Sequence, residues 1–365
     1  MWQDTEVSRR LKLRFPIIQG PFGGGLSSTE LLVAVSEAGG LGSFGAHHLP
    51  PAQLRDLAAG IRARTQKPFA LNLWVSDHDP GGLSLTPEQF QEGVERFRPY
   101  YEALGIPPPA MPERYGQRFE EQVEALLDVR PPVFSFVFGI PSADVLAECR
   151  RRDIVTLGTV TTLDEALAMQ AAGVDMVVAT GMEAGGHRVS FLRSAEDSLT
   201  GTFALVPVVA DRVSVPVIAA GGIADGRGIA AALTLGAQGV QLGTAFLACE
   251  ESNASAPHRA ALFSDAARYT ALTRAFSGRL ARGLRNRFVE DMAARQPPLF
   301  PYPIQGFFTG SFRQAAIAQD RADLISLWAG QAAPLLRHRK AEALFAELVR
   351  DTTAILERRG GPRAP

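Results

Sequence analysis

Short apolar runs alternate with helical stretches along the first two thirds of the chain, and each run ends in a turn of small residues. When a helix connects two successive strands of one sheet, the two strands run parallel. This alternation therefore predicts a mostly parallel sheet with helices outside it. The eight predicted strands are residues 15–19, 41–45, 68–75, 133–138, 154–160, 175–180, 216–221 and 239–243.

Eight strand and helix units over about 240 residues have the size of an α/β fold of the (β/α)₈ TIM barrel type. Most strand starts lie 21 to 27 residues apart, which fits one strand, one helix and two short loops. We therefore expect residues 1–252 to form the barrel. After residue 252 the alternation stops, so residues 253–365 are expected to form a C-terminal helical segment that packs on the barrel as a lid.

Two intervals between the predicted strands are too long for a single helix. Residues 76–131 are rich in turn residues and predict an insertion at the barrel rim after the third strand. Residues 181–201 follow the sixth strand and contain His187 behind two glycines. Both segments follow the carboxyl end of a strand, where barrels of this type carry their functional groups.

A doubly wound open sheet is the alternative fold. Gly40, Gly42 and Gly45 satisfy the spacing of a dinucleotide-binding glycine motif. That motif follows a strand and opens a helix, whereas these glycines follow a predicted helix and fall within a predicted strand. The context therefore favours the barrel.

The composition points to a small-molecule partner. A formal net charge of -1 and an isoelectric point near 6.6 give no electrostatic reason to expect binding to nucleic acid or to an anionic membrane. Two cysteines are too few for a disulfide framework, and the N-terminal residues lack the apolar core of a signal peptide. We expect a cytoplasmic protein, and the sequence leaves a homo-oligomer open.

Glycine-rich loops follow the seventh and eighth predicted strands, where barrels commonly hold a phosphate. Gly221 and Gly222 allow backbone amides to approach an anion without obstruction by a Cβ atom. Gly243 and Thr244 begin a predicted short helix whose free N–H groups favour the same anion. We therefore expect a phosphorylated cofactor across the barrel mouth, and FMN has a suitable size.

Two polar residues follow other strand ends. Asn72, at the end of the third strand, brings a carboxamide to the mouth, although an asparagine in such a place often caps a turn instead. His187 can act in two ways, because a neutral imidazole accepts a proton and a protonated one stabilises an anion. We expect His187 to be the catalytic residue.

His48 and Tyr302 are candidates for contact with the substrate. His47 and His48 follow the second strand, but adjacent side chains diverge and no third ligand is evident, so we predict no metal site. Tyr302 can reach the mouth from the predicted lid, or it can simply pack there. One of the arginines between residues 274 and 287 can meet a carboxylate of the substrate.

Distinctive motifs are distributed along most of the chain. They are IIQGPFGGG, PFALNLWV, FVFGIP, TGMEAGGHR, VIAAGGIADGRG, GVQLGTAFLACEES, TRAFSGRLARGLRNRF, PYPIQ and SLWAGQAA. Together these motifs resemble the nitronate monooxygenases, formerly called 2-nitropropane dioxygenases, and most closely their class I branch. The resemblance runs from about residue 10 to residue 350.

The resemblance implies a barrel that binds FMN non-covalently and oxidises alkyl nitronates with O₂ to carbonyl compounds and nitrite. Propionate 3-nitronate is the implied substrate, and His187 is the implied catalytic histidine. Pro21 and Phe22 would lie beside the flavin ring through their backbone. The other implied contacts are Asn72 and Gly185 at the flavin, Gly222 at the phosphate, and Gln241, Leu242, Gly243 and Thr244 around the phosphate and ribityl chain.

Three positions depart from the usual residues of this family. Phe22 stands where methionine is usual, and Val189 stands where glycine is usual. Thr180 stands at a flavin-contacting position where glutamine is usual, and its shorter side chain loses one carboxamide contact. These departures concern flavin tuning and substrate range more than the fold.

Two other functions stay open. An FMN-dependent enoyl-acyl-carrier-protein reductase has a similar E-x-G-G-H region and would consume NADH or NADPH, but the insertion and the C-terminal motifs favour the oxygenase. A flavin-binding protein without turnover would fit Thr180 and Val189, whereas the presence of His187 speaks against it.

Overall fold

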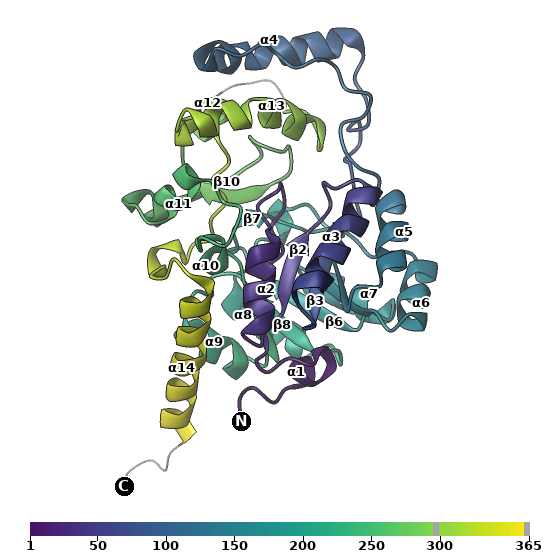
Figure 1. The fold of residues 1–365 in the computed structure, drawn as a ribbon, viewed down its shortest axis with the longest axis vertical. Coiled ribbons are helices and arrows are strands. Elements are labelled where there is room, and N and C mark those ends of the chain that lie inside the picture. Colours follow the sequence, from purple (N-terminus) through teal and green to yellow (C-terminus); the bar gives the residue numbers. More distant parts are fainter. Residues whose placement is uncertain (295–298, 361–365) are drawn as a thin grey trace.

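The computed structural model describes residues 1–294 and 299–360. Eight parallel strands form one sheet in the order β1-β9-β8-β6-β5-β4-β3-β2, and each lies within one of the eight predicted ranges (Figure 1). The strands are β1 (Ile17–Gln19), β2 (Gly42–Gly45), β3 (Phe69–Trp74), β4 (Val133–Val137), β5 (Val155–Val160), β6 (Met176–Thr180), β8 (Val217–Ala220) and β9 (Gly239–Leu242).

The two edges of this sheet meet between β1 and the residue before β2. Ile18 pairs with Leu41 as a parallel bridge. The Leu41 N–H donates to the Ile17 carbonyl at 3.0 Å, and the Leu41 carbonyl accepts from the Gln19 N–H at 2.9 Å. The sheet therefore closes, and the predicted (β/α)₈ TIM barrel is confirmed.

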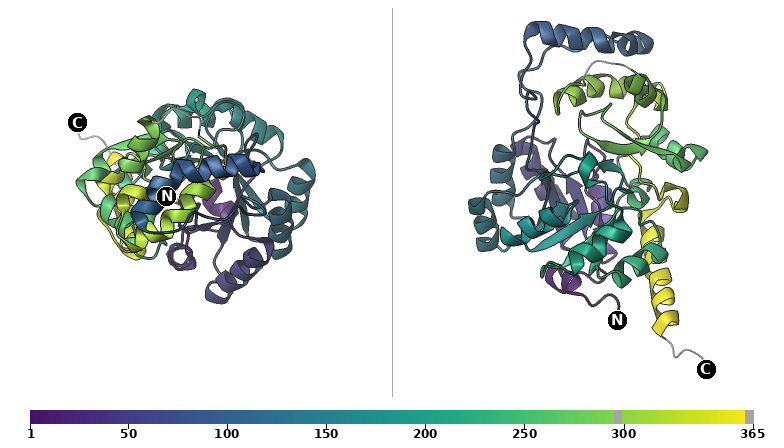
Figure 2. Two further views of the ribbon diagram at one scale, coloured as in Figure 1. Left: turned by 90° about the horizontal axis from the view of Figure 1, so that it is seen from above. Right: turned by 180° about the vertical axis from the view of Figure 1, so that it is seen from behind.

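Helices surround the barrel on its outer side (Figure 2). Helix α2 (Thr29–Glu37) begins after Ser28, whose hydroxyl accepts a hydrogen bond from the Leu31 N–H. Such a side chain satisfies one of the free amide groups at a helix start. The others along the barrel are α3 (Pro51–Arg64), α6 (Ala143–Arg151), α7 (Leu163–Ala171), α8 (Thr202–Ala210) and α9 (Gly226–Thr234). Helix α1 (Glu6–Leu11) instead lies at the end of the barrel opposite the lid (Figure 1).

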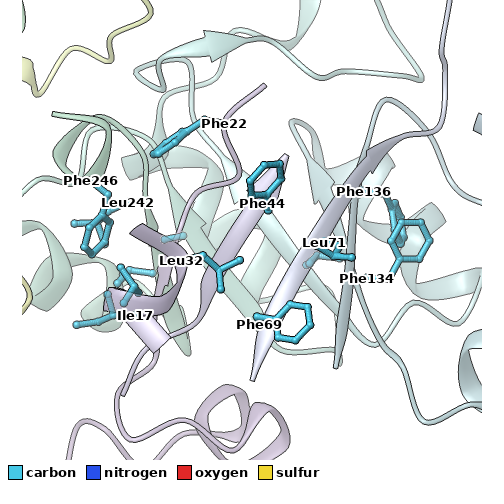
Figure 3. Close-up of a cluster of buried hydrophobic side chains, with 14 of the residues drawn as sticks. Ile17, Phe22, Leu32, Phe44, Phe69, Leu71, Phe134, Phe136, Leu242 and Phe246 are labelled. Carbon is cyan, nitrogen blue, oxygen red and sulfur yellow. The ribbon is translucent and has the colours of Figure 1, made fainter. Parts of the chain in front are cut away.

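The main hydrophobic core lies between the sheet and these helices. Figure 3 shows Leu32 of α2 together with Phe44 of β2 and Phe69 of β3. These side chains are at most 8% exposed, and burying each contributes about 1.5–3 kcal/mol of hydrophobic free energy. This core fixes the strands against their helices and so fixes where each strand ends.

The interior of the barrel is apolar near α1 and polar at the carboxyl ends of the strands. Ile18, Ala70 and Val178 belong to a buried apolar cluster that includes side chains of α1. Because successive side chains of a strand point to opposite faces, the residue two places later points into the same interior. Two places after Ala70 and Val178 these residues are polar, namely Asn72 on β3 and Thr180 on β6.

The insertion after β3 contains two helices with different positions. Helix α4 (Pro87–Leu104) lies above the barrel mouth, whereas α5 (Phe119–Val129) packs against α3 and β3 (Figure 1). Helix α5 is therefore the barrel's own helix between β3 and β4. The predicted insertion of residues 76–131 was too long, because turn residues before α5 obscured the start of that helix.

The C-terminal segment is not wholly helical, which corrects the prediction. Strands β10 (Thr270–Thr273) and β11 (Ala281–Leu284) pair antiparallel, and β11 also pairs with β7 (Gly186–His187). The strands were missed because each has four residues or fewer and no clear alternation of apolar and polar side chains. This small sheet connects His187 to the C-terminal segment.

We call α4, α11 (Ala256–Leu262), α12 (Arg287–Ala294), α13 (Ile304–Ala318), β10 and β11 the lid, because they lie over the barrel mouth (Figure 2). Helix α14 (Ala341–Gly360) instead packs along the barrel wall against α9 and α2. Residues 361–365 of the predicted segment lie outside the described residues. Of the helices that the structure describes, none combines the length and the apolar character needed to cross a bilayer.

The lid has a hydrophobic core of its own. The rings of Phe97 on α4 and Phe308 on α13 are stacked, with centroids 5.4 Å apart. Phe288 on α12 stacks on the Phe97 ring at 6.4 Å. The insertion and the C-terminal segment therefore pack together over the barrel mouth, although they are far apart in the sequence.

Candidate functional site

A cavity of about 340 Å³ lies at the carboxyl ends of the barrel strands, beneath the lid. This volume lies within the range of small-molecule binding sites. Loops that follow β1, β6, β8 and β9 form its walls together with residues of the lid. The predicted site residues that line it are Pro21, Phe22, Asn72, Thr180, Gly185, His187, Gly221, Gly222, Gln241, Gly243, Thr244 and Tyr302.

Leu242 and His48 are predicted site residues that do not line this cavity. The side chain of Leu242 is buried in the core outside the sheet, because it follows Gln241, which points into the barrel. His48 borders a neighbouring cavity of about 330 Å³. His47 lies between the two cavities, so it is the histidine of this pair that meets the main one.

The loop after β6 is anchored on both sides of His187. His187 pairs with Ala281 of β11. The next residue, Arg188, is buried, and its guanidinium donates to the carbonyls of Thr180 at 2.5 Å and Thr161 at 3.2 Å. Pairing on one side and these hydrogen bonds on the other hold the histidine at the cavity wall.

The imidazole of His187 is enclosed by aromatic rings. The centroid distances are 5.0 Å to Trp74 and 5.5 Å to Trp328, and Nε2 lies 2.8 Å from the Ser277 hydroxyl. Burial, together with the positive charge of Arg279, lowers the pKa of His187 to about 3. The imidazole is therefore neutral at pH 7, which disfavours the predicted role of a protonated imidazole and leaves that of a neutral hydrogen-bonding group.

Several residues that line the cavity have backbone amides without protein partners. The N–H groups of Gly221, Gly222, Gly243 and Thr244 make no hydrogen bond to another protein group within residues 1–294 and 299–360. A Cβ atom added at Gly243 would meet nothing within 4 Å, so the space beside it is open. The Thr244 hydroxyl accepts from the Gly330 N–H at 2.9 Å and keeps its own proton to donate. Such convergent donors suit a phosphate.

Polar side chains lie on other walls of the cavity. The Asn72 amide nitrogen donates to the Ser135 hydroxyl at 3.0 Å, which leaves the Asn72 side-chain oxygen able to accept. In the part of the chain that the structure describes, the side chains of Thr180 and Gln241 form no hydrogen bonds. A few such groups in a mostly apolar cavity are typical of sites that orient a small molecule.

Sequence reasoning missed Trp74 and Trp328, which form an aromatic wall of the cavity together with the predicted Tyr302. Trp74 stacks on His47 with centroids 3.9 Å apart, and the Tyr302 ring lies 5.2 Å from Trp74. Trp74 could have been predicted, because it lies two residues after Asn72 on the same strand. Trp328 follows no barrel strand, so no periodic signal in the sequence points to it.

Arg279 connects the barrel, the insertion and the lid. Its guanidinium donates to the Asp79 carboxylate and to the Ser76 carbonyl, each at 2.9 Å, and lies 4.3 Å from the centroid of the Tyr302 ring. Arg279 and Asp79 therefore form an ion pair. Of the arginines expected to meet a substrate carboxylate, Arg279 is thus already paired within the protein.

The burial of His258 is expected to make the fold sensitive to acid. Its Nε2 bonds to the Trp328 carbonyl at 3.0 Å, and burial lowers the pKa of His258 to about 4. An unfolded histidine has a pKa of about 6.5, so the unfolded chain takes up a proton that the folded chain resists, and stability falls as the pH drops from about 6.5 toward 4.

We expect His258→Gln to remove about 2 kcal/mol of the loss in unfolding free energy between pH 7 and pH 5. Urea denaturation of both proteins at the two pH values measures this difference. An equal loss in the variant and the wild type would mean that His258 does not carry the acid sensitivity.

The chain is similar to known proteins over nearly its whole length. The family model described as nitronate monooxygenase matches residues 5–351. A probable nitronate monooxygenase of Staphylococcus aureus (strain Newman) is 38% identical over 358 residues, covering 98% of this chain and 99% of that protein. A nitroalkane oxidase from Streptomyces ansochromogenes superposes with a TM-score of 0.86 at 35% identity, covering 97% of this chain and 99% of that one. FabK from Thermotoga maritima gives a TM-score of 0.75 at 29% identity over 97% of this chain and 98% of that one.

Proposed function

Because the chain belongs to the nitronate monooxygenase family, we propose that it oxidises alkyl nitronates with O₂ to carbonyl compounds and nitrite, using FMN. Propionate 3-nitronate is the proposed substrate. The observation that carries the proposal is one cavity lined both by His187 and by the partner-free amides of Gly222, Gly243 and Thr244.

The residues of the cavity fit FMN bound without a covalent link. The amides of Gly222, Gly243 and Thr244 would hold the phosphate, and Asn72 and Thr180 would lie at the ring. When bound, FMN supplies the electron chemistry of the reaction. The protein would contribute binding, orientation and exclusion of water by the lid.

His187 would act as a neutral hydrogen-bonding group beside the nitronate. A nitronate is already deprotonated, so its oxidation needs no general base. The low pKa of His187 also makes it a weak base toward a neutral nitroalkane. We therefore propose that the enzyme prefers nitronates to the corresponding neutral nitroalkanes.

The experiment that tests this function is a visible spectrum of the purified protein followed by O₂ consumption with propionate 3-nitronate, with and without NADH. We expect a yellow protein that consumes O₂ and releases nitrite with the nitronate alone. Rapid oxidation of NADH without nitronate turnover would instead indicate a flavin-dependent enoyl reductase. A yellow protein that turns over neither would indicate a flavin-binding protein without this activity.

A further inference from the structure

Arg313 of α13 lines the cavity, and no carboxylate of residues 1–294 and 299–360 forms an ion pair with it. Within the described residues its only hydrogen bond runs from Nη1 to the Gly24 carbonyl at 2.6 Å. Burial lowers the pKa of Arg313, and no acid among the described residues offsets this effect. A guanidinium has five N–H donors, so most donors of Arg313 remain available.

The other arginines near the cavity differ from Arg313 in this respect. Arg279 is paired with Asp79 at 2.8 Å. Arg282 donates to the Met182 carbonyl at 2.8 Å, and the negative charge of Glu183 acts on it. A partly buried cation without a counter-charge is unfavourable, and such a cation in a cavity is expected where a ligand brings the anion.

The face of α13 that carries Arg313 leaves space for a ligand. Gly306, Gly310 and Arg313 follow one another at intervals of four and three residues, so they share one face of the helix, and all three line the cavity. A Cβ atom at Gly310 would meet nothing within 4 Å, and one at Gly306 would meet only the Phe276 carbonyl oxygen at 4.0 Å. The space along α13 toward Arg313 is therefore open.

We propose that Arg313 binds the carboxylate of an acidic alkyl nitronate whose nitronate end lies at His187. A planar guanidinium matches a carboxylate with two parallel hydrogen bonds, which a single-point cation does not. This inference rests on the proposed function and adds a residue that determines specificity. Arg313 would make the enzyme select nitronates with an acidic tail over uncharged ones.

The test compares propionate 3-nitronate with the nitronate of methyl 3-nitropropanoate, which has the same skeleton and an uncharged tail. We expect the wild type to use the ester about 30-fold less well in kcat/KM, mainly through KM. Arg313→Gln should lose about 30-fold with the acid and less than about threefold with the ester. Arg350→Gln, an exposed arginine on α14, is the matched control and should change neither value.

A second measurement does not depend on turnover. Succinate binding to the FMN-loaded protein, measured by calorimetry, should weaken about 30-fold in Arg313→Gln. If that variant does not fold, Arg313→Lys keeps the charge without the planar group and should give an intermediate loss for the acid only. If the wild type turned over no nitronate, the proposed function would fail, while succinate binding would still decide the role of Arg313.

Three results would overturn this inference. Equal losses with the acid and the ester would mean that Arg313 only fastens α13 to the Gly24 loop. Loss of FMN from Arg313→Gln would mean that the arginine serves the cofactor phosphate. Unchanged succinate binding and kinetics would mean that it meets no ligand.

Discussion

His187→Ala is expected to lower kcat/KM for propionate 3-nitronate by about 100-fold or more, while the protein keeps its FMN. The wild-type imidazole is held by the Ser277 hydroxyl and by the rings of Trp74 and Trp328, so it meets the substrate in one fixed orientation. Alanine removes that hydrogen-bonding group but leaves unchanged the amides of Gly222, Gly243 and Thr244, which we call the phosphate corner. Steady-state O₂ consumption and the flavin absorbance of the purified variant measure the two effects separately.

Two comparisons make the His187 prediction specific. His338→Ala, which removes a histidine paired with Glu347 at 2.7 Å, should leave kcat/KM unchanged. Because the pKa of His187 is lowered to about 3, the wild-type kcat/KM should show no titration of this group between about pH 5 and pH 9. A kinetic pKa near 6.5 that disappears in His187→Ala would contradict the neutral, buried imidazole.

Gly243→Asp is expected to weaken FMN binding by about 100-fold or more. A side chain at this position enters open space beside the partner-free amides, so its carboxylate would lie next to the cofactor phosphate. Two like charges about 4 Å apart repel by about 4 kcal/mol near a protein surface. Fluorescence titration of the apoprotein with FMN measures the change in Kd.

Gly243→Asn is the matched control for the phosphate corner. Asparagine has nearly the same shape as aspartate, and both residues are suitable at Gly243, the residue that precedes α10 (Thr244–Leu247). Steric effects should therefore be shared, and the aspartate variant should bind FMN at least about tenfold more weakly than the asparagine variant. Equal Kd values for the two variants would place the phosphate elsewhere.

The barrel could be predicted because its signals are local. Each strand is a short apolar run and each following helix has apolar residues on one face, so alternation alone fixed the number and order of the eight strands. The position of Asn72 at the end of the third predicted strand directed attention to it, whereas Thr180 was identified only through the resemblance to the family. The loops after the sixth, seventh and eighth predicted strands, with His187, Gly222 and Thr244, followed from the general position of sites in this fold.

A C-terminal lid was predicted, but its small sheet and its packing against α4 could not be, because these contacts are long-range. Phe97 and Phe308 stack although more than half of the chain separates them, and neither flanking sequence indicates the other. Strand β11 is recognisable only through its partners β7 and β10. Trp328 and Arg313 reach the cavity from this part of the chain, so neither a strand end nor a periodic pattern marked them as site residues.

The central claim is that FMN lies in this cavity with its phosphate at the amides of Gly222, Gly243 and Thr244 and its ring beside His187. A crystal structure of the FMN-loaded protein tests it most directly. The account predicts phosphate oxygens within hydrogen-bonding distance of those three amides and the flavin ring against the His187 side of the cavity. A flavin bound elsewhere, or one in this cavity with its phosphate away from those amides, would contradict it.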